Sequence, residues 1–471
     1  MCGRGGDRAL VVRKTTAHSF AKKGGTEMRA KLVLTTLVLI LGLTFVGLVT
    51  PASVAAGSPA KGSISLSLWA SSQTLSEMYA NVVTPKFLEK YPEVKNVEVN
   101  YTPIADFVKK IAVALPAGSA SDIMEIEDSW ATPFVTAGYF APNPPELVAL
   151  IKDHMSSGLA KNLTFRGNSY GVPVSQFHEL MYYNLDRLKE AGISKIPDTM
   201  DELVSAAVKM TKRDPSGKID VSGFSMRLGG NPAGTSQKFW VLGLLPNGVD
   251  IWEESKQTPG KYHAGFNNEG GVKALKFYID LLYKHRVDDF ASMKDSEAFS
   301  KGKTASLMRE PYVGSEVTKK GPDIKWISAP MPRGSVQRAT FLISLNMYVP
   351  KTTTGVKRDY AFKFIELLLS PEIQETIVVK RANRSPLADF KYSGKVDPRM
   401  APGFAFPADM KVYMVPMHNA YDLSQVKLGE ALPTVFKKAE LLNNPEALKK
   451  EVEKLAELVN DAYRQFDEFA P

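Results

Sequence analysis

The sequence predicts an α/β fold, in which strands alternate with helices along the chain and form a largely parallel sheet. The pattern that predicts it is a strand–helix–strand–helix–strand succession that starts at Gly62. The composition agrees, since 44% of the residues are apolar and 23% are charged, which is typical of globular proteins. A length of 471 residues corresponds to about three domains. These values exclude a disordered, a collagen-like or a multi-spanning membrane chain.

Hydrophobic periodicity predicts the elements of the first part of the chain. Apolar residues alternate with polar ones over residues 64–69 and 97–101, which indicates two strands. Helical spacing over residues 75–90 and 104–115 indicates two helices, and residues 122–126 are predicted to form a short buried strand.

The ends of the predicted strands indicate where a ligand would bind. In parallel α/β sheets, ligands bind beyond the carboxyl ends of the strands. The sequence therefore directs the search for a site to residues 69–73 and 127–130.

Start signals mark helices in the middle and at the end of the chain. Thr199 and Glu202 have the spacing of a capping box. Ser370-Pro371 and Asn444-Pro445 each place a cap residue before a proline at the first helical position. In the last helix, six apolar residues recur at three- and four-residue steps and predict a stripe that faces the core. They are Leu448, Val452, Leu455, Val459, Tyr463 and Phe466.

The net charge of +9 is concentrated at the N-terminus. Residues 1–31 contain eight basic and two acidic residues, which leaves only +3 for the rest of the chain. A nearly neutral body does not indicate a nucleic-acid partner.

The N-terminal region has the pattern of an export signal over residues 28–56. Arg29 and Lys31 precede an apolar run from Leu32 to Val49, and small residues follow at the positions that a signal peptidase reads. Residues 1–27 are expected to be a non-native extension from a start codon assigned too early. An uncleaved membrane anchor is the alternative, and both interpretations deliver the body outside the cytoplasm, to the periplasm or the extracellular space.

The single cysteine, Cys2, lies in the leader. The body therefore contains no disulfide, no cysteine-ligated zinc site and no cysteine nucleophile. No cysteine follows the apolar run, so a lipobox for lipid attachment is also absent.

Catalytic and cofactor motifs do not occur in the body of the chain. The sequence contains no HExxH, GxSxG or CxxC motif, and its histidines make no metal-spaced pair. We therefore predict no cofactor and no metal site. Tyr182 and Tyr183 are interpreted as one strand with its two rings on opposite faces. The adjacent acids Glu127 and Asp128 suit a glycoside-cleaving enzyme only if a second acid lies across a cleft, and nothing in the sequence locates one.

Eight segments, in order, resemble one family. They are SLSLW (65–69), TPKFLEKYPEVKNVEVNYTP (84–103), ALPAGSASDIMEIEDSW (114–130), NSYGVPV (168–174), MYYNLDRLKEAGISKIPDTMDELVSAA (181–207), FNNEGGVKALKFYIDLL (266–282), FSKGKTASLMREPYVG (299–314) and DYAFKFIELLLSPEIQ (359–374). With them the chain resembles the extracellular sugar-binding proteins of ATP-driven (ABC) importers, in the maltose-binding-protein class. The resemblance runs from about Gly62 to Gln374.

The resemblance implies a two-lobed periplasmic-binding-protein fold with three hinge crossovers and a ligand cleft between the lobes. The N-terminal lobe would comprise residues 62–173 plus 331–384. The C-terminal lobe would comprise residues 174–330 plus 385–471, with a first hinge strand at residues 170–174.

The resemblance also implies a function without catalysis. The chain would capture a sugar or oligosaccharide by hinge closure, as a monomer, and deliver it to the membrane permease of an ABC importer. A secreted glycoside-cleaving enzyme is one alternative. The same fold with a non-sugar ligand, such as ferric iron or a polyamine, is the other.

Sugar sites combine aromatic platforms with a few polar groups, and by similarity the first lobe offers five candidates. Trp69 and Trp130 are its platforms, at or just past strand ends. Asp128 is the expected acceptor for sugar hydroxyls, unless its side chain caps a helix. Gln176 and His178 follow the hinge strand, where the family often has a polar contact.

The second lobe also offers five candidates. Tyr312 follows Glu310-Pro311, where similar proteins place a stacking aromatic residue, and a core tyrosine is the alternative. Trp240 is a second platform, and core burial is its alternative too. Asn231 and Tyr421 are further candidates, although residues 385–471 depart most from the family pattern.

Overall fold

The structure is a computed structural model that describes residues 59–471 except 294, 393 and 417. The leader assigned to residues 1–27 and the signal peptide assigned to residues 28–56 lie outside the described residues. The described residues form one compact unit. Within this unit, every helix is too short or too polar to cross a membrane.

Fifteen strands occur in the described residues. They are β1 (Ile64–Ala70), β2 (Val94–Tyr101), β3 (Ile123–Glu127), β4 (Thr164–Phe165), β5 (Asn168–Ser169), β6 (Val172–His178), β7 (Leu180–Asn184), β8 (Lys212–Arg213), β9 (Ile219–Val221), β10 (Trp252–Glu254), β11 (Tyr262–Ala264), β12 (Ser306–Arg309), β13 (Trp326–Ala329), β14 (Arg338–Tyr348) and β15 (Met410–Met414).

The α-helices are α1 (Gln73–Met78), α2 (Thr84–Lys90), α3 (Ile104–Ala114), α4 (Asp128–Thr136), α5 (Pro145–His154), α6 (Ser157–Asn162), α7 (Leu185–Glu190), α8 (Met200–Met210), α9 (Pro232–Phe239), α10 (Glu269–Ile279), α11 (Asp295–Ser300), α12 (Tyr312–Lys320), α13 (Gly355–Leu368), α14 (Pro371–Arg381), α15 (Ala401–Phe404), α16 (Tyr421–Phe436) and α17 (Pro445–Gln465). The π-helical turns are η1 (Tyr79–Val83), η2 (Trp240–Leu244) and η4 (Asp280–Lys284), and the 3₁₀ turns are η3 (Leu245–Asn247) and η5 (Ala439–Asn443).

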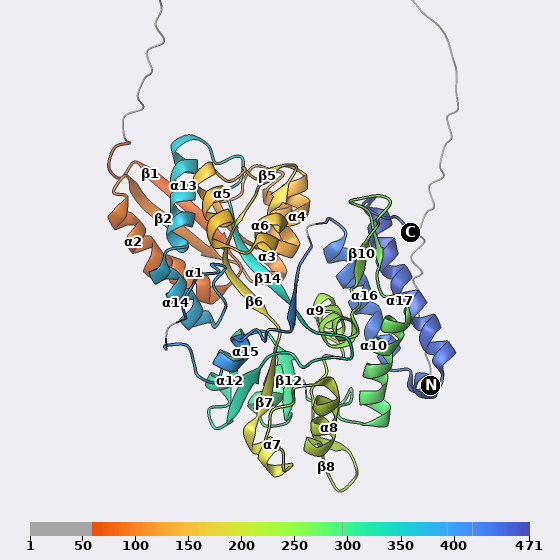
Figure 1. Ribbon diagram of the computed structural model, residues 1–471. Coiled ribbons are helices and arrows are strands. Elements are labelled where there is room, and N and C mark those ends of the chain that lie inside the picture. The colour runs from red at the N-terminus through yellow and green to blue at the C-terminus, as the bar shows by residue number, and fades with distance from the viewer. Residues whose placement is uncertain (1–58, 294, 393, 417) are drawn as a thin grey trace, which may run out of the picture. The chain divides into compact units, whose positions relative to one another are not determined.

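A six-stranded sheet organises the first lobe (Figure 1). Strand β1 pairs in parallel with β2 and β3, as the alternation of strands and helices predicts. Strand β14 pairs antiparallel with β3 and with β6, and in parallel with β15. The sheet is therefore mixed rather than largely parallel, because β6 and β14 belong to segments that pass between the lobes.

A smaller sheet of three strands, in the order β12-β7-β13, organises the second lobe. All its pairings are antiparallel, which also departs from the predicted parallel arrangement. Tyr182 and Tyr183 are neighbours on β7 and join different hydrophobic clusters, so their rings lie on opposite faces as predicted.

The chain passes between the two sheets in four places, the last of them from α15 to β15, which pairs with β14 in the six-stranded sheet. It leaves β6 for β7 through Glu179, and it returns from β13 to β14 through residues 330–337. The third passage leads from α14, which packs in the first lobe, to α15, which lies next to β13. How the chain divides into lobes at particular residues stays a prediction.

The predicted helix-start residues differ in whether their side chains make capping hydrogen bonds. The capping box of Thr199 and Glu202 is present at α8. The side chain of Asn444 accepts a hydrogen bond from the amide of Ala447 at 3.0 Å and caps α17. Ser370 occupies the cap position of α14, but its side chain makes no capping hydrogen bond.

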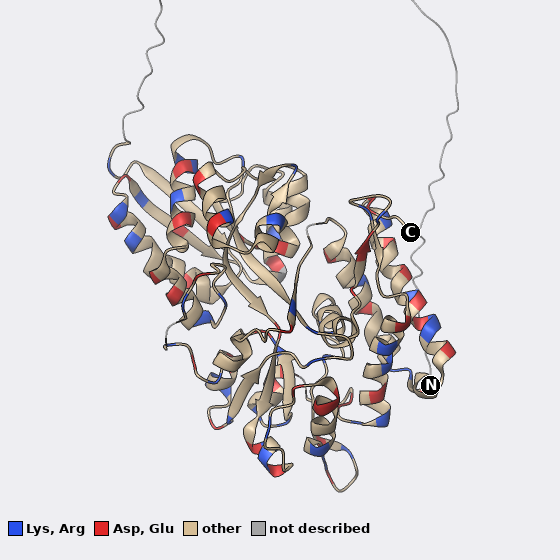
Figure 2. Cartoon of the chain, in the orientation of Figure 1, with Lys and Arg blue, Asp and Glu red and all other residues tan. Residues whose placement is uncertain are grey.

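Helix α17 packs its apolar stripe on the core of the second lobe, where it joins α10 and α16. Five residues of the predicted stripe are buried, whereas Phe466 is 42% exposed because it follows the end of the helix. Basic and acidic residues alternate on the outer faces of helices such as α13 and α17 (Figure 2).

Candidate functional site

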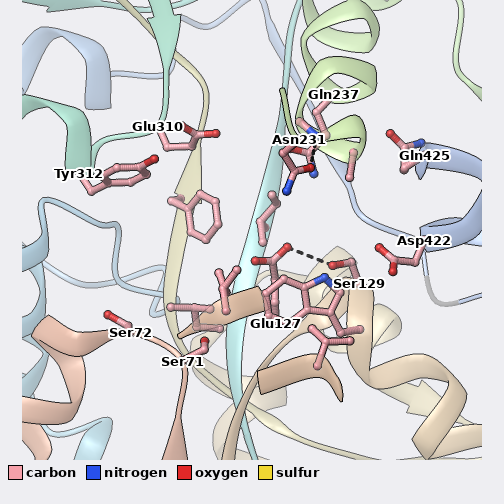
Figure 3. Close-up of a pocket in the computed structure, with 18 of the residues that line it drawn as sticks. Ser71, Ser72, Glu127, Ser129, Asn231, Gln237, Glu310, Tyr312, Asp422 and Gln425 are labelled. Atoms are coloured by element: carbon pink, nitrogen blue, oxygen red, sulfur yellow. Dashed lines mark hydrogen bonds between the residues drawn. The ribbon is translucent and has the colours of Figure 1, made fainter. Parts of the chain in front are cut away.

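A cavity of about 460 Å³ lies between elements of the two sheets and helix α16. Its first wall comes from the carboxyl ends of β1 and β3, as the rule for α/β sheets predicts. Ser71 and Ser72 follow β1, Glu127 ends β3, and Ser129 lies in the first turn of α4 (Figure 3). Trp130 is in the same turn.

The second wall comes from α9, β12 and α12. Asn231 caps α9, where its side chain accepts a hydrogen bond from the amide of Gly234 at 3.1 Å. Glu310 follows β12, and Tyr312 begins α12 (Figure 3). The hydroxyl of Tyr312 accepts a hydrogen bond from the guanidinium of Arg309, which also lies 5.6 Å from the centre of the ring.

Helix α16 supplies the third wall through its first turn. Tyr421, Asp422 and Gln425 line the cavity. Gln425 accepts a hydrogen bond from the hydroxyl of Ser236 on α9 at 2.8 Å, which joins the second and third walls.

A buried network of ion pairs lies behind the second wall. Lys238, which is 2% exposed, contacts Glu179 of the crossover and Glu310 at 3.1 Å. Arg309 contacts Glu310 at 2.7 Å and Asp295 at 2.5 Å. Although burial alone would raise the pKa of Glu310, Lys238 and Arg309 hold it well below its ordinary value, so this acid is ionised.

The acids of the first and third walls have the opposite behaviour. The pKa of Glu127 is raised to about 7, mainly by burial and also by the charge of Asp422, although the hydrogen bond from Ser129 and the charge of Arg381 lower it. Burial also raises the pKa values of Asp422 and Asp128. These carboxyl groups therefore hold protons at higher pH than free side chains do.

The structure brings five of the predicted site residues together in the cavity wall: Trp130, Asn231, Glu310, Tyr312 and Tyr421. Their contact with a ligand stays a prediction.

Two of the predicted aromatic platforms lie outside the cavity wall. Trp240 is 0% exposed, stacks on Phe341 at 4.7 Å and belongs to the core of the second lobe, which is its alternative assignment. The ring of Trp69 is covered by the ammonium group of Lys110, 3.5 Å from its centre. Neither residue lines the cavity.

Three predicted polar contacts are also used inside the protein. Asp128 accepts hydrogen bonds from the backbone of Ser129 and Ser344, so it holds α4 against β14. Gln176 donates to the hydroxyl of Ser344 at 3.1 Å. A ring nitrogen of His178 lies 3.1 Å from the carbonyl of Gly403, and burial lowers the pKa of this histidine to about 3.

Sequence reasoning missed several charged residues of the wall: Arg227, Arg309, Arg381 and Asp422. Arg227 and Arg309 lie next to residues that were predicted, so proximity to Asn231 and Glu310 is a signal for them. Asp422 directly follows the predicted Tyr421, which is a signal for it, whereas Arg381 had none, because only the folding of α14 brings it to the cavity.

Metal ligation has no geometric basis in the described residues, which hold no group of three or more histidine, cysteine, aspartate or glutamate side chains suited to an ion. What the cavity presents is aromatic rings beside carboxylates, guanidinium groups, hydroxyls and amides. This combination suits a polar ligand with apolar faces.

Comparison with known proteins agrees with the predicted resemblance. The chain is 23% identical over 273 residues to the diacetylchitobiose-binding protein DasA of Streptomyces coelicolor, which covers 56% of this chain and 60% of the relative. It is 21% identical over 270 residues to a binding protein of Brucella abortus, which covers 56% of this chain and 62% of the relative. The chain thus spans about three fifths of the length of these curated relatives.

Solved structures show the same two-lobed α/β fold. The cyclic α-maltosyl-1,6-maltose-binding protein of Arthrobacter globiformis has a TM-score of 0.70 at 18% identity, with 86% of this chain and 100% of that chain covered. The GacH receptor of Streptomyces glaucescens has a TM-score of 0.68 at 21% identity, with 86% and 99% covered. The model of the family described as bacterial extracellular solute-binding protein matches residues 71–375. Because this match covers more than half of the 471 residues, the chain belongs to the bacterial extracellular solute-binding protein family.

Proposed function

We propose that this chain is the extracytoplasmic substrate-binding component of an ABC importer, which captures a sugar or oligosaccharide and delivers it to a membrane permease. It binds the ligand without chemical conversion, and closure of the two lobes holds the ligand in the cavity. The N-terminal signal over residues 28–56 exports it to the periplasm or the extracellular space.

The observation that carries the proposal is the composition of the cavity wall. Trp130 and Tyr312 come from different walls and supply aromatic surface for the apolar face of a sugar ring. Asn231, Gln237 and Ser129 supply polar groups for the hydroxyls around it (Figure 3). Proteins of similar sequence or fold include binders of diacetylchitobiose and of cyclic maltosyl-maltose, which supports a carbohydrate ligand.

A thermal-shift panel tests the proposal. The purified protein is melted with monosaccharides, linear oligosaccharides and cyclic oligosaccharides, with spermidine and ferric citrate as non-sugar probes. A ligand at 100 times its Kd adds about 2.7 kcal/mol of stability, which is a clear rise in Tm. A shift with at least one sugar supports the proposal. A shift with spermidine or ferric citrate alone would contradict it.

The enzyme alternative has its own test. Asp422 lies near Glu127 in the cavity wall. Under the enzyme alternative, Asp422 is the second acid, which the sequence did not locate. The relatives are binding proteins, and we expect no reducing ends to be released when the protein is incubated with the oligosaccharide that stabilises it. Sustained release that Glu127→Gln abolishes would establish glycoside cleavage instead.

A further inference from the structure

The charged groups around the cavity divide into one balanced set and one unbalanced set. The balanced set lies behind the second wall, where three bases meet three acids in one network of contacts. The bases are Arg227, Lys238 and Arg309, and the acids are Glu179, Asp295 and Glu310. These charges compensate one another without a ligand.

The unbalanced set lies on the first and third walls. Glu127 and Asp422 line the cavity, and Glu125 and Asp128 are buried behind Glu127. The remaining cation of the wall, Arg381, donates to the hydroxyl of Ser72 at 2.7 Å, and its charge lowers the pKa values of Glu125 and Glu127. This side of the cavity wall therefore presents two acids, Glu127 and Asp422, and one base, Arg381.

Polar groups beside these acids lack partners. Tyr421 is 1% exposed, lines the cavity, and its hydroxyl makes no hydrogen bond with the described residues. The amide nitrogen of Gln425, which is fully buried, is also without a partner in this part of the chain. Asp422 likewise has no hydrogen bond or ion pair to a described residue. Buried polar groups are normally paired, so this wall has the features of a site that a ligand completes.

Figure 3 shows how the two acids of the wall lie. The carboxyl group of Glu127 accepts a hydrogen bond from the hydroxyl of Ser129 at 3.0 Å, and Asp422 lies on the other side of Ser129. A group placed beside Ser129 is thus flanked by two carboxyl groups from different elements, β3 and α16.

We propose that the ligand carries a basic nitrogen, as amino sugars do, and that its ammonium group lies between Glu127 and Asp422. An ammonium group has three donors and a positive charge, so it pairs with both carboxylates at once. A neutral hydroxyl has a single donor and no charge, so it bonds to one carboxyl group and compensates the charge of neither. The inference rests on the proposed function and names the class of sugar.

The titration of the carboxyl groups in this wall supports the assignment and predicts how the affinity changes with pH. Without ligand, burial and the charges of Asp422 and Glu310 raise the pKa of Glu127 to about 7, while Arg381 lowers it. Tyr421, Asp128 and Glu125 are the other titratable groups of this side of the cavity. An ammonium group lowers the pKa of both carboxyl groups, so binding at pH 6 releases protons. Affinity for a cationic ligand therefore increases between pH 5.5 and pH 7.

Calorimetric titration with matched sugars tests the proposal. The pairs are glucosamine with glucose, galactosamine with galactose, and the β-1,4-linked glucosamine disaccharide with cellobiose. Diacetylchitobiose is a further control, because it keeps the nitrogen of that disaccharide but not its charge. We expect the amine of at least one pair to bind about tenfold more tightly or better than its neutral partner, as for a charge-assisted contact. Titration at pH 6 in two buffers of different ionisation enthalpy reports the released protons.

A variant locates the charge. Asp422→Asn should weaken binding of the amine about tenfold and change binding of a neutral partner about threefold or less. Asp323→Asn changes an exposed turn residue that does not line the cavity, so it is the matched control and should leave both unchanged.

Three results would overturn the inference. They are neutral sugars that bind as tightly as their amines, an amine whose binding Asp422→Asn does not weaken, and no binding by any member of the pairs. After any of these three results, the proposed function would still stand if a neutral sugar from the wider thermal-shift panel binds.

Discussion

Tyr312 begins helix α12 at the cavity, and both its hydroxyl and its ring contact Arg309. Burial and the charge of Glu310 raise its pKa to about 12, so the hydroxyl stays protonated at physiological pH. Trp240 has a different environment, since Phe341 and Trp252 enclose its ring in the core. The two aromatic residues therefore have different roles, one at the cavity and one in packing.

Tyr312→Ala should weaken sugar binding by about tenfold or more, because a lost aromatic contact and its buried area exceed about 1.4 kcal/mol. Tyr312→Phe keeps the ring, so we expect it to retain most of the affinity. Calorimetric titration and the ligand-free Tm of both variants check this. Unchanged affinity with a strongly lowered Tm in Tyr312→Ala would show a core tyrosine instead.

Glu127 makes stability depend on pH in a predictable direction. Its pKa is about 7 in the folded protein against an ordinary 4.5, so between these values the folded state binds more protons than the unfolded state. Its contribution to stability is therefore complete below pH 4.5 and is lost as the pH rises through 7. The free energy of unfolding of Glu127→Gln, taken relative to that of the wild type, should therefore be about 3 kcal/mol higher at pH 8 than at pH 4.

Denaturant unfolding at the two pH values measures this difference for Glu127→Gln. Glu89→Gln changes an exposed acid on α2 and is the matched control, for which the difference should be near zero. Equal values for the two variants would show that Glu127 titrates like a free side chain.

At the scale of elements, the first turns of helices build much of the cavity. Helices α4, α12 and α16 each begin at its wall, and Asn231 at the start of α9 also lines it. Loops and helix ends carry polar groups to one place while the strands remain in the core. Helix starts elsewhere in the fold differ in how completely they are capped.

Two caps offer a direct comparison of this difference. Asn444→Ala should destabilise the protein by about 1 kcal/mol, since it removes a side-chain hydrogen bond at the start of α17. Ser370→Ala changes a cap position without such a bond, so we expect a loss of about 0.5 kcal/mol or less. Denaturant unfolding of both variants measures the contrast. Equal losses would mean that the Asn444 bond contributes little.

At the scale of the whole molecule, a cavity between two sheets that several passages of the chain join allows closure by hinge motion. A ligand favours the closed form only to the extent that it binds that form better. The three walls of the cavity come from different elements, among them β3, α12 and α16. A ligand that contacts all three walls at once makes contacts in the closed form that the open form does not offer.

Small-angle scattering measures closure directly. A saturating sugar should reduce the radius of gyration without changing the molecular mass, because the cavity is built from one chain. Identical scattering profiles with and without saturating ligand would contradict hinge closure. A doubled mass would contradict the monomer.

The sequence by itself determined most of the local structure and the class of the fold. Periodicity predicted β1, β2, β3 and the helices between them, because burial on one face imposes a period of 2 or 3.6 on the residues. Capping residues predicted the starts of α8 and α17, since a cap bonds to a backbone group only a few residues away. Strand ends at residues 69–73 and 127–130 predicted the place of the first wall.

Only the tertiary structure decided which residues meet at the cavity. Contacts between segments far apart in the chain decide three features that the sequence did not determine. They are the strand directions in the sheets, the burial of Trp240 and the position of Lys110 over the ring of Trp69. Asp422 reaches Glu127 from nearly 300 residues away. Periodicity reports whether a side chain is buried, but the identity of its neighbours follows from how the elements pack, and that is a property of the whole fold.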